Sequence, residues 1–119
     1  MIKLYNTNLE TNKLESVDTY TRGTWIHMVD PSEEEIKEVC QNVNIKEDFI
    51  RYALDNEEKA RIDVEDEDDT ILFIIDIPVT EKSQSGGYMY ATMPIGMIVV
   101  RDDFFITCLL YTSDAADDK

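Results

Sequence analysis

Two long apolar runs, separated by a short segment without any apolar residue, constrain the fold of this chain most strongly. The runs are Thr70–Val79 and Tyr88–Val100, and the segment between them, Thr80–Gly87, contains two serines and a Gly-Gly pair. Runs rich in β-branched and aromatic residues are typical of strands, and a polar, glycine-containing break is typical of a hairpin loop. The sequence therefore predicts two strands, the first of them interior, joined by a mobile loop over residues 80–87.

Shorter strand patterns lie on both sides of this hairpin. Two runs near the N-terminus surround polar Asn/Thr turns and predict a first hairpin, and a third run is rich in strand formers. A further run, beginning at Ala60, alternates apolar and charged residues with a period of two, which predicts a half-exposed strand. The predicted strands outside the long hairpin are Ile2–Tyr5, Lys13–Val17, Thr24–Val29, Ala60–Glu65 and Phe104–Thr107.

A helix is predicted to begin directly after the third strand. Asp30 is a suitable N-cap, Pro31 fits the first turn, and Glu33 lies three residues after the cap. Apolar residues then recur at i, i+3, i+4 and i+7, which predicts one buried face. That face comprises Ile36, Val39, Cys40 and Val43.

A second, shorter helix is predicted from the next repeat of the capping pattern. In that pattern Asn44 would be the cap and Glu47 the residue three positions after it. Asp48 and Arg51 lie off the buried stripe and are expected to face solvent or a partner. The stripe comprises Phe49, Ile50, Ala53 and Leu54.

The order of strands, two helices and strands predicts the fold class. We expect an α/β sandwich, with a mixed, largely antiparallel sheet flanked by short helices. The regular alternation of a doubly wound fold is absent from the sequence.

Charge and composition limit the functions that this chain can have. The chain has 119 residues, of which 43% are hydrophobic, so one globular domain is expected. Asp and Glu outnumber Lys and Arg by 26 to 11, giving a net charge of −15. Such a surface repels phosphate backbones and argues against nucleic-acid binding, whereas it suits a soluble protein or one that attracts cations.

No catalytic motif supports an enzyme. The chain has a single histidine, His27, in a predicted strand, and it contains no phosphate-binding glycine motif. The two cysteines form no CxxC motif, and no apolar run approaches the length of a membrane span of about 20 residues. These features predict a domain in a reducing compartment that does not itself cross a membrane.

The acidic segment Asp63–Asp69 resembles a calcium-binding loop only in composition. Counting from Asp63, the sixth position is Asp68 instead of glycine and the twelfth is Ile74 instead of glutamate. The segment is therefore predicted to be a solvated turn.

The last residues do not continue the preceding strand pattern. Residues 108–119 resemble the conceptual translation of a sequencing adapter read through at the end of a contig. We therefore expect a natural domain over residues 1–107 and a non-native tail over 108–119, the alternative being a genuine polar C-terminus.

Three segments in the same order resemble a known family. The first is Trp25–Glu35, a tryptophan-led strand followed by a proline and acidic residues that open a helix; the second is Glu47–Glu65, a Glu-Asp helix, a charged break and a strand. The third is Ile71–Pro78 with the later strands Tyr90–Val100 and Phe104–Thr107. Together they resemble the N-terminal cytoplasmic domain of the CorA family of magnesium and cobalt transporters. One departure is Lys59-Ala60-Arg61, where many members have an Arg-Pro pair.

This resemblance implies a regulatory domain that senses divalent cations. Members of the family assemble as homo-pentamers, with Mg²⁺ bound between the cytoplasmic domains of adjacent subunits and holding the pore closed. The family's Glu-Asp pair, which faces carboxylates on a neighbour's stalk, corresponds here to Glu47 and Asp48. A stalk helix, two membrane helices and a Gly-Met-Asn motif would follow this domain, so the chain alone is expected not to conduct ions.

The resemblance also implies a location and a state of assembly. The complete transporter would lie in the cell membrane with this domain on its cytoplasmic side, attached through the missing C-terminal helices. The isolated chain is expected to be mostly monomeric and to bind regulatory Mg²⁺ only weakly.

Two alternatives remain open from the residues alone. Glu47 could be only a capping-box residue, and Asp48 only an anion in the first turn of a helix. The whole chain could be a stand-alone acidic module that docks basic partners.

Overall fold

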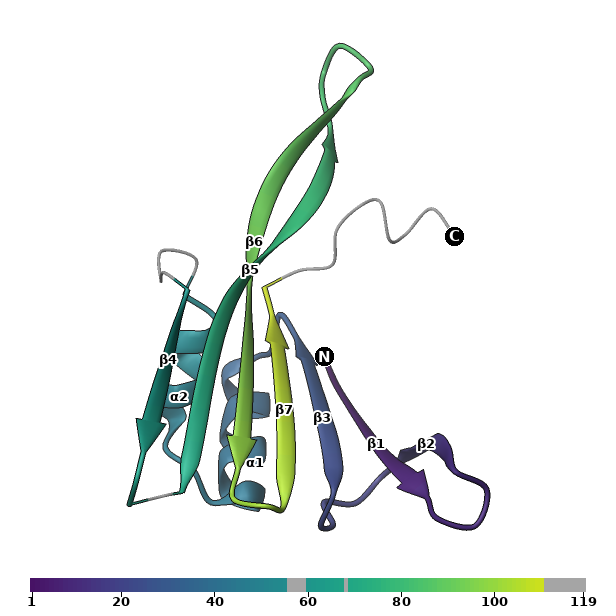
Figure 1. Ribbon diagram of the computed structural model, residues 1–119, viewed down its shortest axis with the longest axis vertical. Coiled ribbons are helices and arrows are strands. Elements are labelled where there is room, and N and C mark those ends of the chain that lie inside the picture. The colour runs from purple at the N-terminus through teal and green to yellow at the C-terminus, as the bar shows by residue number, and fades with distance from the viewer. Residues whose placement is uncertain (56–59, 68, 111–119) are drawn as a thin grey trace.

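A single seven-stranded sheet with two helices against one of its faces makes up the described part of the chain (Figure 1). The structure is a computed structural model and describes residues 1–55, 60–67 and 69–110. The elements are β1 (Ile2–Asn8), β2 (Lys13–Val17), β3 (Thr24–Val29), α1 (Glu33–Val43), α2 (Glu47–Ala53), β4 (Arg61–Glu65), β5 (Thr70–Lys82), β6 (Tyr88–Val100) and β7 (Phe104–Leu109).

The strand order confirms the predicted fold class. The order is β2-β1-β3-β7-β6-β5-β4, and every neighbouring pair is antiparallel except β3 and β7. The parallel β3–β7 pair joins a three-strand unit from the start of the chain to a four-strand unit from its second half. The sheet is therefore mixed and largely antiparallel, and β3 matches its predicted limits.

The long hairpin has a shorter loop than the sequence predicted. β5 and β6 pair without interruption from Thr70 opposite Val100 to Lys82 opposite Tyr88. Residues 80–82 are therefore strand, because ladder pairing satisfies their backbone groups although they have no apolar side chains. The distal half of the hairpin extends beyond its neighbours β4 and β7, which pair with it only as far as Ile74 and Ile95 (Figure 1).

The core lies between the helices and one face of the sheet. The predicted apolar face of α1 is buried, and so are Phe49, Ile50 and Ala53 of α2. Gly96 of β6 allows α2 to approach closely, because a Cβ atom at this position would lie 2.9 Å from the Cα atom of Ala53. This contact fixes the distance between α2 and the sheet.

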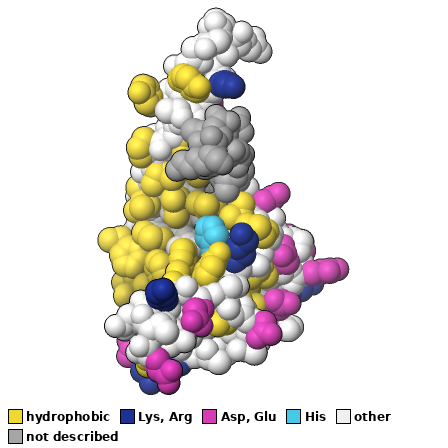
Figure 2. All heavy atoms as spheres, turned by 90° about the vertical axis from the view of Figure 1, so that its right-hand side faces the viewer, with side chains coloured by type: hydrophobic (Ala, Val, Ile, Leu, Met, Phe, Trp, Pro, Cys, Tyr) yellow, Lys and Arg dark blue, Asp and Glu magenta, His cyan; other side chains and the backbone are white. Residues whose placement is uncertain are grey.

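The opposite face of the sheet carries apolar side chains without a covering helix among the described residues. Ile62 and Val64 of β4 are 65% and 63% exposed, and Phe105 of β7 is 38% exposed. Figure 2 shows hydrophobic side chains gathered on the left, on this side of the sheet, and acidic side chains on the right and along the bottom of the view. An exposed apolar surface thus lies on the sheet face opposite the helices.

The start of α1 differs from the prediction. Ser32 is the N-cap: its Oγ accepts a hydrogen bond from the Glu35 backbone N–H (3.1 Å), and the Ser32 N–H donates to Glu35 Oε1 (2.9 Å). The predicted cap, Asp30, lies two residues earlier with a positive φ of 42°. The Ser-x-x-Glu capping box satisfies two backbone donors, and Ser32 has the extended backbone of an N-cap (φ −74°), which Asp30 does not have.

The last strand runs two residues further than predicted. β7 ends at Leu109, and Cys108 is fully buried in the core. The predicted tail from residue 108 therefore begins inside β7. The assignment of 108–119 as non-native stays a prediction, and residues 111–119 lie outside the described residues, as do residues 56–59 in the charged break between α2 and β4.

Candidate metal-binding site

Glu47 and Asp48 are the first two residues of α2. The backbone before them is shaped by Asn44, which takes a left-handed conformation (φ 59°) as the C-cap of α1 and donates its N–H to the Cys40 carbonyl. The N-cap of α2 is Lys46, without a side-chain cap bond. The predicted capping box from Asn44 to Glu47 is therefore wrong, because Asn44 ends the preceding helix.

The Glu47 carboxylate is engaged by an arginine one turn along the helix. Arg51 Nη2 donates to Glu47 Oε1 at 3.3 Å, and the same guanidinium makes a two-point contact with Glu33 on α1, at 3.0 and 2.6 Å. The Arg51 guanidinium lowers the pKa of Glu33, chiefly by hydrogen bonding, and Glu33 raises the pKa of Arg51 in turn. Arg51 thus joins the two helices instead of facing only solvent or a partner, and its guanidinium also contacts Glu47.

Asp48 has a different environment. Its side chain is exposed, and no hydrogen bond or ion pair joins it to another residue in the described part of the chain. Adjacent residues of a helix project in different directions, so Glu47 and Asp48 do not converge on one point. Of the two, Asp48 is the carboxylate available to an external cation.

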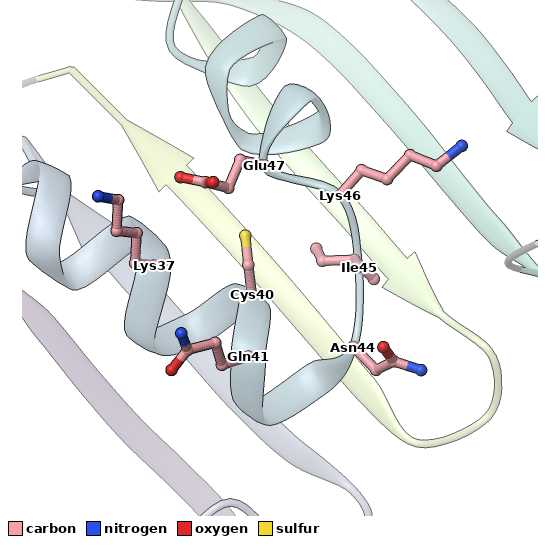
Figure 3. A pocket seen from close by; sticks show the side chains of 7 residues that line it. All are labelled: Lys37, Cys40, Gln41, Asn44, Ile45, Lys46 and Glu47. Carbon is pink, nitrogen blue, oxygen red and sulfur yellow. The ribbon is translucent and has the colours of Figure 1, made fainter.

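The surface beside Glu47 is a shallow pocket of about 520 Å³ between α1 and the start of α2 (Figure 3). It is lined by Lys37, Cys40, Gln41, Asn44, Ile45, Lys46 and Glu47. Two of these residues are lysines, whose charge opposes a divalent cation in the pocket. Burial, and secondarily the Glu47 charge, raises the pKa of the Cys40 thiol to about 11, so this thiol is protonated at neutral pH.

The described residues do not contain a preformed metal centre. Within residues 1–55, 60–67 and 69–110, no group of three or more His, Cys, Asp or Glu side chains could hold an ion. Any ion bound at the start of α2 would need further ligands from water or from another molecule.

Comparisons with known proteins give the family. The model of the family described as "CorA-like Mg2+ transporter protein" matches residues 21–118. The chain belongs to this CorA-like family. No curated protein matches the chain.

Solved structures give the same fold. The soluble domain of CorA from Methanocaldococcus jannaschii superposes with a TM-score of 0.74 at 22% identity, covering 99% of this chain and 44% of that one. The complete CorA magnesium transporter from the same organism gives a TM-score of 0.70 at 17% identity, covering 99% of this chain and 35% of that one. This chain therefore spans less than half the length of either structure. None of its described helices is long and apolar enough to cross a membrane.

Arg51 contributes to this site, although from the sequence it was expected only to face solvent or a partner. Its spacing of four from Glu47 was a usable signal for an ion pair within α2. Its stronger contact, with Glu33, depends on how α1 packs beside α2 and has no local signal.

Proposed function

We propose that this chain is the divalent-cation-sensing, regulatory domain of a CorA-type magnesium and cobalt transporter, with no catalytic role. Membership of the CorA-like family supports a role in transport. The observation that carries the sensing role is the exposed Asp48 carboxylate at the start of α2, beside a Glu47 that Arg51 already occupies.

In this proposal Asp48 supplies half of a binding site. Mg²⁺ keeps several waters and is usually held by only one or two carboxylates, so a second carboxylate from a neighbouring subunit would complete the site. The ion would offset the repulsion between the two carboxylates, and its loss would loosen the interface and shift the population towards open states.

The proposed setting is a homo-pentamer in the cell membrane, with this domain on the cytoplasmic side and attached through further helices. For the chain by itself we propose a mainly monomeric state, because a net charge of −15 opposes self-association.

Titration of the chain with Mg²⁺, followed by backbone amide NMR at low salt, tests the binding role of Asp48. We expect weak binding, with the largest shifts at the start of α2, and loss of those shifts in Asp48→Asn. Arg51→Gln should strengthen binding, because it removes a positive charge near the start of α2 that repels the cation. Asp76→Asn, which removes another exposed carboxylate from β5, is the matched control and should leave the α2 shifts unchanged.

Equal α2 shifts in the wild type and in Asp48→Asn would contradict the role of Asp48. Absence of any α2 shift in the wild type would favour the alternative of an acidic docking module. Either result would leave the family and the fold unaffected.

A further inference from the structure

The parallel junction between β3 and β7 carries a hydrogen-bond network on the apolar side of the sheet. Trp25 Nε1 lies 2.9 Å from Thr107 Oγ1, and His27 Nδ1 lies 2.8 Å from the same oxygen. His27 and Thr107 are direct partners in the β3–β7 register, so their side chains share one face of the sheet. We call Trp25, His27 and Thr107 the Thr107 network.

The protons of this network can be assigned from donor and acceptor chemistry. The indole N–H can only donate, so Thr107 Oγ1 accepts from Trp25. The hydroxyl has one proton of its own, and among the described residues the other polar atom bonded to it is His27 Nδ1. All three groups are satisfied when the hydroxyl donates to Nδ1 and His27 is neutral with its proton on Nε2.

The surroundings of His27 oppose a positive charge on the ring. Lys3 of β1 stands directly opposite His27 in the β1–β3 register, and the other described side chains around it on this face are Tyr5, Trp25, Thr107 and apolar residues. No carboxylate is among these neighbours. Burial first, and the Lys3 charge second, lower the pKa of His27 from its ordinary 6.5.

We propose that the Thr107 network is a pH-sensitive contact between the two strand units of the sheet. Its hydrogen bonds are complete while His27 is neutral and are weakened when His27 takes up a proton. Protonation puts a hydrogen on Nδ1, so the Thr107 hydroxyl loses its acceptor and a second positive charge appears opposite Lys3. The β3–β7 pair is the junction through which residues 2–29 join the sheet formed by residues 61–109. Loss of a hydrogen bond at this junction therefore destabilises the association of the two strand units.

The sign of the pH dependence follows from the lowered pKa. The unfolded chain takes up the histidine proton at a higher pH than the folded chain does. The stability that neutral His27 confers is therefore complete above about pH 6.5 and declines as the pH falls through the lowered pKa of the folded state. Most carboxyl groups titrate about two pH units lower, so the window between pH 5 and 6.5 isolates the histidine.

The single histidine of the chain makes NMR titration of the imidazole nitrogens an unambiguous test. In the wild type we expect the Nε2–H tautomer at pH 7.5 and a titration midpoint below 6.5. Thr107→Val should shift the midpoint upwards, because the hydrogen bond that favours the neutral ring is lost, whereas Thr107→Ser should restore it. The urea midpoint should fall between pH 7 and 5.5 in the wild type, and by less in His27→Gln.

Three results would overturn the proposal. They are an Nδ1–H tautomer in the wild type, a titration midpoint that Thr107→Val leaves unchanged, and an equal pH dependence of stability in the wild type and in His27→Gln. The tautomer is read on the unmodified protein, so this outcome is decisive even if a variant fails to fold.

Discussion

Replacing Gly96 by alanine is expected to destabilise the domain by about 1–3 kcal/mol, the usual cost of overpacking a well-packed interior. The new methyl group would lie 2.9 Å from the Cα atom of Ala53 and 3.2 Å from its carbonyl oxygen, so it would meet the backbone of α2. Because α2 must move away from β6 to relieve this contact, the position of Asp48 at the start of the same helix should also change. Urea unfolding measures the first effect, and amide chemical shifts along α2 measure the second.

Gly87→Ala is the matched control for this substitution. A Cβ atom at Gly87 would meet only Ser83 Oγ at 3.6 Å, an ordinary van der Waals distance, so the free energy of unfolding should change by less than about 0.5 kcal/mol. An alanine at Gly96 that costs no more than the alanine at Gly87 would show that α2 does not sit as closely on β6 as described.

Replacing Ile50 by alanine is expected to cost about 2–5 kcal/mol, the range for large-to-small changes in a packed core. Ile50 of α2 is fully buried against the sheet, so the truncation leaves a cavity that the surrounding strands cannot fill. The free energy of unfolding in urea, extrapolated to water, measures the loss.

Ile62→Ala removes the same atoms from an exposed site. Ile62 is 65% exposed on the edge strand β4, so the loss should stay below about 1 kcal/mol, the span of strand propensity. Similar losses at Ile50 and Ile62 would contradict the placement of the core on the helix side of the sheet.

Periodicity in the sequence was sufficient to predict the elements of the fold. The period of 3.6 in α1 identified its buried face, and the strand pattern at Thr24–Val29 gave β3 with both limits correct. These predictions succeeded because a helix or strand that buries one face has its apolar residues at a regular spacing, which can be read from the segment alone.

The ends of the elements were less predictable. At the start of α1, Asp30 and Ser32 each have a glutamate three residues later, and the structure forms the capping box at Ser32 with Glu35. Residues 80–82 have no apolar side chains, yet they are strand because their partners across the hairpin continue the ladder. The second outcome depends on a partner strand that a local pattern does not include.

The candidate site was predictable as a pair of residues and not as an arrangement. Resemblance to CorA proteins identified Glu47 and Asp48, and the spacing of four between Glu47 and Arg51 was a local signal for an ion pair. The contact of Arg51 with Glu33, 18 residues away on α1, requires the packing of two helices and had no such signal. The engagement of Glu47 by Arg51 shifts the proposed binding role from the pair to Asp48.

Magnesium-dependent protection from protease, in a complete transporter that carries this domain, tests the proposed sensing role of Asp48 most directly. The comparison is between the wild type and Asp48→Asn, with Asp76→Asn as the control for loss of one exposed negative charge. We expect the wild type and Asp76→Asn to be protected at the same Mg²⁺ concentration, and Asp48→Asn to need a higher one. Protection of all three proteins at the same Mg²⁺ concentration would contradict a sensing role for Asp48 and leave it as an ordinary anion in the first turn of α2.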